Sequence, residues 1–169
     1  MSDKIVNRVA SSELKTIDLE DYYPKGERTI LDIKNWLFHE IILKETDFRE
    51  HLKNHDWSQY QNKYVALTCS ADAIIPSWAF MLITTYISPF SKKIVVGDLT
   101  NLETAIFQDI INTLPIDEFS KKPIIIKGCA HKPIPMTAYT QLIEKLQPIA
   151  KSIMFGEACS TVPLFKKKI

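Results

Sequence analysis

Short apolar runs alternate with helical patterns along the last hundred residues of the chain. Four runs have the length of strands and are apolar over most of that length, which is typical of strands buried on both faces of a parallel sheet. Helical patterns separate them at 75–88, 102–114 and 137–147. This order predicts an α/β fold with a mostly parallel sheet flanked by helices. The predicted strands are Tyr64–Thr68, Lys93–Gly97, Pro123–Lys127 and Ser152–Phe155.

The first sixty residues carry weaker signals. Thr16–Leu19 and Thr29–Ile33 have the composition of strands, and an acidic cap followed by Glu50 predicts a helix from Asp47 to about His55. No low-complexity linker separates this region from the rest. We therefore expect a single domain over residues 1–169, with 1–60 as an N-terminal covering layer and 61–169 as the α/β core.

An internal repeat links two parts of this core. A constant offset of 59 aligns residues 75–98 with residues 134–157 and gives seven identities. Shared core positions explain two isoleucines, but not two prolines, a lysine and a glycine in register. We therefore expect a duplicated β-α-β unit. The identical residues of the first copy are Ile75, Pro76, Ala79, Pro89, Lys92, Ile94 and Gly97.

Composition narrows the classes of function. Of the 169 residues, 46% are hydrophobic, and 21 basic against 20 acidic side chains leave a formal charge of +1. This balance does not indicate a nucleic-acid or acidic-membrane partner, and we interpret Lys166–Lys168 as a frayed, solvated tail. His39, His51 and His55 have charged neighbours and are interpreted as solvated. The N-terminus leads into no apolar signal core, so we expect a cytoplasmic protein.

One uncharged stretch runs from Ala73 to Ser91. Two prolines and several hydroxyl side chains interrupt it, so it is typical of a crossover helix and not of a membrane span. The equivalent helix of the second copy has Glu144 and Lys145 for solvent. We expect the outer face of helix 75–88 to be covered by the N-terminal residues, or by a protein partner or a second subunit in a homodimer.

The three cysteines follow predicted strands. Cys69 and Cys129 end the equivalent strands of the two copies, and Cys159 follows the last strand. If one sheet has the strand order 2-1-3-4, all three thiols lie at its carboxyl edge, where open α/β sheets bind ligands. An odd number of cysteines argues against a disulfide framework.

Three thiolates are a candidate metal site. They can hold zinc with a fourth ligand, or an iron–sulphur cluster, and His131, Glu157 and Asp72 are candidates for the fourth position. The spacing is not the C-x-x-C pattern that is diagnostic of zinc, and free cysteines are also ordinary core residues. Metal ligation, inert packing and a nucleophilic thiol aided by His131 or Glu157 all stay open at this point.

Three motifs carry a resemblance to a known family. They are Ile17–Pro24 (IDLEDYYP), Cys69–Pro76 (CSADAIIP) and Gly156–Pro163 (GEACSTVP). On these motifs the chain resembles, over nearly its whole length, a bacterial family of uncharacterised proteins, domain of unknown function 2480. The resemblance implies no activity, and His131 does not belong to the family pattern. It implies gene neighbourhoods of iron–sulphur cluster assembly, which favours a metal- or cluster-binding accessory protein over a protein-interaction module or a thiol enzyme.

Overall fold

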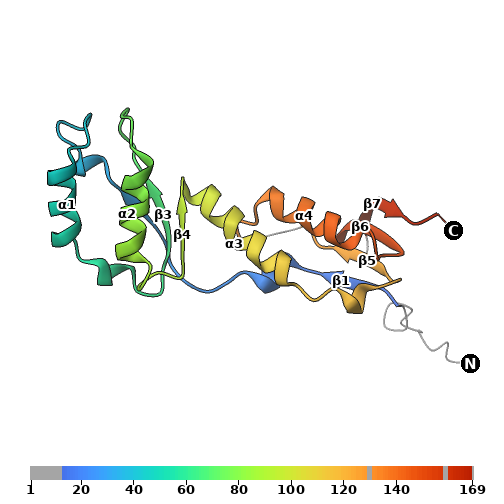
Figure 1. The fold of residues 1–169 in the computed structure, drawn as a ribbon. Helices are drawn as coiled ribbons and strands as arrows, with labels where there is room; N and C mark the ends of the chain where they lie inside the picture. Colours follow the sequence, from blue (N-terminus) through green and yellow to red (C-terminus); the bar gives the residue numbers. More distant parts are fainter. Residues whose placement is uncertain (1–12, 129–130, 158–159, 169) are drawn as a thin grey trace, which may run out of the picture. The chain divides into compact units, whose positions relative to one another are not determined.

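The computed structural model describes residues 13–128, 131–157 and 160–168, and it divides the chain into two compact units (Figure 1). Unit 2 spans residues 24–106, and unit 1 combines residues 1–23 with residues 107–169. Unit 2 is therefore inserted into the chain of unit 1. The strands are β1 (Lys15–Ile17), β2 (Arg28–Asp32), β3 (Tyr64–Thr68), β4 (Lys93–Val96), β5 (Pro123–Ile126), β6 (Ser152–Glu157) and β7 (Ser160–Lys166), and the helices are α1 (Glu45–Asn54), α2 (Ser77–Ile87), α3 (Leu99–Thr113) and α4 (Met136–Leu146).

Unit 2 contains a parallel sheet of three strands in the order β2-β3-β4. Every second residue of the central strand, Val65 and Leu67, is fully buried in one hydrophobic cluster. Both helices of the unit contribute to that cluster, through Phe48 and Leu52 of α1 and through the apolar stripe of α2. Because alternate residues of a strand point to the same face, α1 and α2 cover the same side of this sheet.

Unit 1 contains a sheet of four strands in the order β1-β5-β6-β7. The first three strands are parallel, and β7 pairs with β6 in the antiparallel direction. Ile124 and Ile126 of β5 are buried with Phe107 of α3 and Leu142 of α4, so these two helices again share one face of the sheet. The predicted α/β class with mostly parallel strands is confirmed.

The duplicated β-α-β unit is also confirmed. Helices α2 and α4 keep the offset of 59 at both ends, and their buried stripes occupy equivalent positions. Equivalent backbone bonds recur as well: Asn62 donates to Phe90 O in unit 2 and Lys121 donates to Ile149 O in unit 1, both at 2.8 Å. The buried stripes are Ala79, Ile83 and Ile87 in α2, and Ala138, Leu142 and Leu146 in α4.

The repeat extends to a strand that the sequence comparison did not include. Strand β2 lies parallel to β3 as β1 lies parallel to β5. The register makes Asp18 equivalent to Asp32, and each carboxylate accepts the N–H of the residue two positions on at 3.0 Å. In both units this bond begins a short 3₁₀ helix, η1 (Leu19–Tyr22) and η2 (Lys34–Trp36). Each unit therefore has the same three parallel strands, with an aspartate at the carboxyl end of the first.

The prediction of one sheet with the order 2-1-3-4 is wrong. Strands β3 and β4 belong to one sheet, and β5 and β6 belong to another. Each sheet is completed by an N-terminal strand, β2 beside β3 and β1 beside β5. Strand β7 was not predicted. Proline is uncommon inside a strand, and Pro163 is accommodated because β7 is an edge strand.

Helix α2 is a crossover between the parallel strands β3 and β4, as the interruptions of the uncharged stretch predict. Over the part of the chain that the structure describes, no helix combines the length and the apolar character needed to cross a membrane. Unit 1 and unit 2 have separate hydrophobic clusters. The expectation of one domain over residues 1–169 stays a prediction.

An ion pair joins the first and last segments of unit 2. Arg28 Nε lies 2.6 Å from the Glu103 carboxylate, and both side chains are about nine-tenths buried, with exposed fractions of 12% and 10%. The same guanidinium donates to the carbonyl groups of Pro24 and Gly26 at 2.8 and 2.7 Å. Arg28 therefore ties strand β2 to the connector before it and to helix α3.

Candidate functional site

The acidic motif that follows β1 holds the loop that follows β5. The Asp18 carboxylate lies 3.2 Å from Lys127 Nζ, at the start of this loop. The Glu20 carboxylate accepts the backbone N–H groups of His131 and Lys132, the latter at 2.9 Å, and Lys132 Nζ donates to Glu20 O at 2.9 Å. The described residues on both sides of 129–130 are thus bound to a single motif at the carboxyl edge of the sheet.

The carboxyl end of β6 contributes to the same edge. Phe155 is paired with Ile126, and a Cβ added to Gly128 would lie only 2.7 Å from the Phe155 ring. The hydrogen bond to Asp18 raises the pKa of Lys127, and the charges of Asp18 and Glu157 raise it further. Lys127 is therefore a cation at neutral pH, placed between the acidic motif and the end of β6.

Cys129 and Cys159 themselves lie outside the described residues. Their described neighbours are at this edge: Gly128 precedes Cys129, and Glu157 and Ser160, which pair across β6 and β7, bracket Cys159 in the sequence. The side chains of His131 and Glu157, the other predicted ligands from unit 1, are exposed. Whether these four residues bind a metal is a prediction that the described residues do not test.

Cys69 belongs to the other unit. It follows β3, is half-buried, and packs against the hydrophobic cluster under α1 and α2. Its Sγ lies 4.0 Å from Ala71 O. The prediction that three thiols lie at one sheet edge depended on a single sheet. Because β3 belongs to one sheet and β5 and β6 to another, that argument no longer holds. Among the described residues, no three His, Cys, Asp or Glu side chains form a group that could hold a metal ion.

The equivalent edge of unit 2 has a simpler arrangement. Asp32 accepts the backbone N–H of Ser70 at 3.0 Å as well as that of Lys34. Partial burial raises the pKa of Asp32, but these hydrogen bonds outweigh burial, and the pKa lies below its ordinary value. Asp72, the further candidate ligand, is exposed on the loop after Cys69. Asp32 is therefore ionised at neutral pH, and its carboxylate holds this loop through the hydrogen bond from Ser70.

The interpretation as a solvated side chain is confirmed for His51, which is exposed, but it is wrong for His55, which is half-buried. His51 stacks on Trp36, with ring centroids 6.0 Å apart, and His55 lies 4.7 Å from Trp57. His55 Nε2 also shares a hydrogen bond of 2.9 Å with Tyr60 Oη. Aromatic neighbours from η2 and η3 (Trp57–Tyr60) surround the imidazole of His55, whereas His51 has a ring contact with Trp36, and the charged neighbours in sequence did not indicate these contacts. They stabilise unit 2 by packing.

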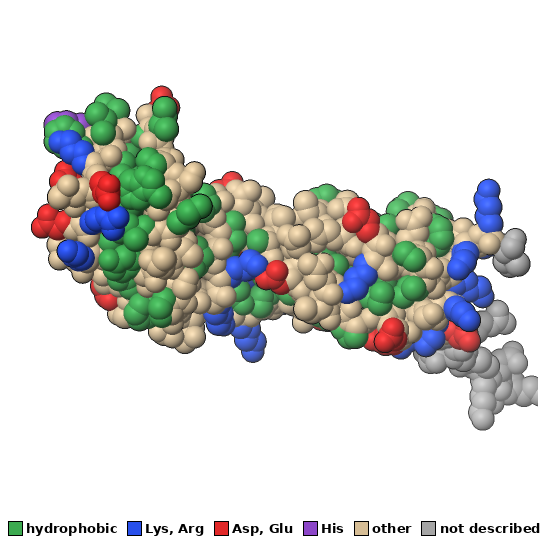
Figure 2. All heavy atoms as spheres, viewed as in Figure 1, with side chains coloured by type: hydrophobic (Ala, Val, Ile, Leu, Met, Phe, Trp, Pro, Cys, Tyr) green, Lys and Arg blue, Asp and Glu red, His purple; other side chains and the backbone are tan. Residues whose placement is uncertain are grey.

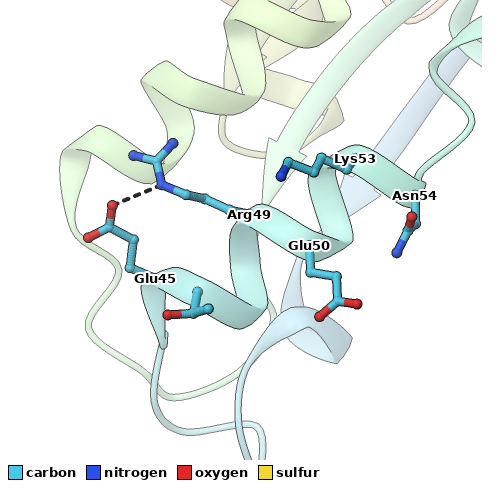
Figure 3. Close-up of a pocket in the computed structure, with 6 residues that line it drawn as sticks. Glu45, Arg49, Glu50, Lys53 and Asn54 are labelled. Atoms are coloured by element: carbon cyan, nitrogen blue, oxygen red, sulfur yellow. Dashed lines mark hydrogen bonds and ion pairs between the residues drawn. The ribbon is translucent and has the colours of Figure 1, made fainter.

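The polar hollow drawn in Figure 3 is lined by helix α1 alone. Its volume is about 550 Å³, and an ion pair of 2.8 Å between Glu45 and Arg49 crosses one end. The pair has the i,i+4 spacing of a solvated helix face, and both side chains are more than half exposed. No second element contributes a residue, so the hollow lacks the convergent groups of a binding site.

The sequence pattern did not indicate the cluster of charged residues at the carboxyl edge of the unit 1 sheet. Asp18, Glu20, Lys127 and Lys132 were not among the predicted site residues, although two of them lie in the IDLEDYYP motif. The equivalence of Asp18 and Asp32 was the available signal, but it becomes visible only through strand register.

All three motifs noted in the sequence lie at the carboxyl ends of strands. IDLEDYYP follows β1, CSADAIIP follows β3, and GEACSTVP begins at the end of β6. No curated protein and no solved structure matches the chain significantly. The model of one family, described as "Protein of unknown function (DUF2480)", matches residues 3–167. Because this match covers almost the entire sequence, the chain belongs to the DUF2480 family.

Proposed function

We propose that the protein is an accessory protein that binds zinc or an iron–sulphur cluster at the carboxyl edge of the unit 1 sheet. The observation that supports this proposal is that β5 and β6 are neighbouring strands of one sheet. Ile126 pairs with Phe155 in the parallel register, so Cys129 and Cys159 follow neighbouring strands of one sheet. Carboxyl ends of adjacent parallel strands are where open α/β sheets bind ligands.

Two short segments supply the donors. They are Cys129-Ala130-His131, which follows β5, and Glu157-Ala158-Cys159, which begins at the last residue of β6. Two thiolates, one imidazole and one carboxylate are a suitable set of four ligands for tetrahedral zinc, and the thiolates also suit an iron–sulphur cluster. When bound, zinc would cross-link the two loops, whereas a cluster would add one-electron chemistry.

Two lysines at this edge favour the thiolate form of a nearby cysteine, and the carboxylates of Asp18, Glu20 and Glu157 oppose it. A cysteine binds metal in its deprotonated form, and nearby cations lower the pKa of a thiol. Lys127 and Lys132, both held by the acidic motif, are the cations on the loop that contains Cys129. The packing of Cys69 against the core of unit 2 supports its assignment as a structural residue in this proposal.

Metal analysis of protein purified without oxygen tests the proposal. We expect about one zinc ion per chain, or iron and sulphide with the absorption of a cluster. Cys129→Ser and Cys159→Ser should each lose the metal, because serine is a poor ligand for soft metals. Cys69→Ser, which removes a thiol outside the proposed set, should keep it.

A chelator experiment provides a second readout. Bound metal stabilises the native state, so chelator should lower the melting temperature of the wild type but not that of Cys159→Ser. Absence of metal from the wild type, or equal chelator effects on both proteins, contradicts the proposal. If Cys69→Ser also loses the metal, the set with three thiolates replaces the one proposed here.

A second candidate function is self-association through helix α2. Helix α1 covers part of the uncharged helix, since the rings of Phe48 and Trp78 lie 5.8 Å apart. Met81 is nevertheless 67% exposed and lines a groove of about 440 Å³ between α1 and α2. We propose a second copy of this chain as the occupant, because an uncharged helix gains by packing against itself.

Sedimentation tests this association. Met81→Glu should split the dimer, whereas Thr140→Glu, the equivalent exposed position on α4, should leave it intact. A wild-type protein that sediments as a monomer rules out the dimer and leaves α1 as the cover of α2.

A further inference from the structure

Strand β7 and two loops form a fixed surface at the amino-terminal edge of the unit 1 sheet. The N–H of Lys167 donates to Lys151 O at 3.0 Å, which extends the ladder between β6 and β7 past Lys166. Lys151 in turn donates to Lys122 O at 3.0 Å, and Lys121 donates to Ile149 O at 2.8 Å. The interpretation of Lys166–Lys168 as a frayed tail is therefore wrong for the first two lysines, which β-sheet hydrogen bonds hold in place.

These segments enclose a pocket of about 430 Å³. Its walls are apolar and include the fully buried Ala150 together with Pro123 and Ile149. Five lysines surround the walls, and Figure 2 shows basic side chains gathered around this end of unit 1. The lysines are Lys121, Lys151, Lys166, Lys167 and Lys168.

The described residues do not compensate the charge of this pocket. In the described parts of the chain, none of the five ammonium groups has an ion pair or a hydrogen-bond acceptor. Five cations around one pocket repel each other, although the whole chain has a formal charge of only +1. Their repulsion makes the binding of an anion favourable.

The equivalent corner of unit 2 provides an internal comparison. Lys92, the counterpart of Lys151, donates to Lys25 O at 3.0 Å and lies over the Tyr64 ring. Lys63, the counterpart of Lys122, pairs with Glu27 at 2.9 Å. In unit 2 the connector before β2 thus supplies partners for the lysines, whereas in unit 1 strand β7 adds further lysines. Over the residues that the structure describes, the uncompensated charge is found in unit 1 and not in unit 2.

We propose that this pocket binds a small amphiphilic anion, which carries a phosphate or carboxylate group on a short apolar chain. The volume lies within the range of small-molecule sites. The apolar walls favour an apolar chain over a bare inorganic anion, and the ring of lysines favours a charged head over a neutral one. The site is separate from the carboxyl edge that is proposed to hold metal, because the two lie at opposite ends of the same strands.

Calorimetric titration with octyl phosphate, below its micelle-forming concentration, tests this site on the full chain. We expect saturable binding of one molecule per chain, and affinities at least about tenfold lower for inorganic phosphate and for octanol. The double variant Lys151→Gln, Lys167→Gln should weaken binding of octyl phosphate about tenfold. The control Lys25→Gln, Lys53→Gln removes two exposed lysines of unit 2, which is the same change in net charge, and should bind like the wild type.

Several outcomes overturn the proposal. They are no binding of octyl phosphate, equal affinities for octyl phosphate and inorganic phosphate, or equal loss of binding in the two double variants. Binding to vesicles of acidic phospholipid without binding of monomeric octyl phosphate would instead assign the lysines to a membrane surface. Melting curves of both double variants exclude unfolding as the cause of a loss.

Discussion

Burial shifts the pKa values of two neighbouring residues of unit 2, Tyr60 and His55. Tyr60 is almost fully buried, and burial, with a smaller contribution from the charge of Asp56, raises its pKa to about 12. Burial also lowers the pKa of its partner His55, and the charge of Asp56 opposes this only in part. The two residues share a hydrogen bond, yet their ionised forms are both disfavoured in the folded state.

These shifts predict how stability depends on pH. Unfolded His55 binds a proton more readily than folded His55, so the free energy of unfolding should fall as pH drops below the ordinary value of 6.5. Unfolded Tyr60 ionises near 10, so stability should also fall as pH rises from 10 to about 12. His55→Gln should flatten the acid decline and Tyr60→Phe the alkaline one, by roughly 1–2 kcal/mol at the alkaline end. Denaturant unfolding across this pH range measures both, and unchanged slopes in the variants would refute the assignment.

The two arginine–glutamate pairs of unit 2 provide a matched test of burial. Glu103→Ala leaves the buried guanidinium of Arg28 without its carboxylate, so we expect a loss of about 3 kcal/mol in the free energy of unfolding. Glu45→Ala breaks the exposed pair with Arg49 and should cost less than about 1 kcal/mol. Urea denaturation of both variants measures the difference. Equal losses would show that Arg28 finds sufficient partners in the carbonyl groups of Pro24 and Gly26.

At the scale of elements, the ends of β4 and β6 require glycine in the two copies of the repeat. Gly97 and Gly156 have φ values of +140° and +127°, which side chains rarely adopt. A Cβ at Gly156 would meet the backbone carbonyl oxygen of Ser160, which the β6–β7 hairpin holds in place. A Cβ at Gly97 would meet the side chain of Asn101 instead. The Asn101 side chain can rotate away, although its Oδ1 then no longer accepts the backbone N–H of Asp98 at the start of α3.

We therefore expect Gly156→Ala to destabilise the protein more than Gly97→Ala. Both variants suffer backbone strain of about 1–3 kcal/mol, and the rigid clash should add about 1 kcal/mol at Gly156 alone. Thermal unfolding of the two variants in parallel measures the order. A larger loss for Gly97→Ala would mean that the hydrogen bond from Asp98 N–H to the Asn101 side chain contributes more stability than the β6–β7 turn.

At the scale of the whole molecule, the two units share one continuous helix. Residues 99–106 of α3 belong to unit 2, and residues 107–113 belong to unit 1. Unit 1 is also discontinuous in sequence, because unit 2 separates β1 from β5. Residues of α3 are buried on both sides of this boundary, Leu102 and Ile106 before it and Phe107 and Ile111 after it. We expect a single cooperative transition, as a single domain requires.

Equivalent core variants test this cooperativity. Ile83→Ala in α2 and Leu142→Ala in α4 remove fully buried side chains at matching positions of the repeat, at a cost of about 2–5 kcal/mol each. In a cooperative protein both variants lower the same calorimetric transition. Two transitions, each shifted by only one of the variants, would divide the chain into two independent domains.

The sequence alone determined the elements and the repeat. Strands β3 to β6 and helices α2 to α4 lie within a few residues of their predicted positions, because the period of apolar residues is a local property. The alignment of Ile75–Gly97 with its second copy anticipated the equivalent helices. The same local signal failed for β7, where Pro163 obscured an edge strand.

Only the tertiary structure decided which strands share a sheet. That depends on β1 and β2, two short N-terminal strands that each pair with a different copy, and pairing over such distances leaves no local pattern in the sequence. The same pairing places Asp18 and Glu20 against the loop after β5, more than a hundred residues away, and assigns Cys69 to another sheet. Pairing of β7 with β6 likewise places Lys166 and Lys167 beside Lys151, around the apolar walls of the pocket. The cysteine positions could be predicted as strand ends, but their grouping could not, because contacts between strands set it.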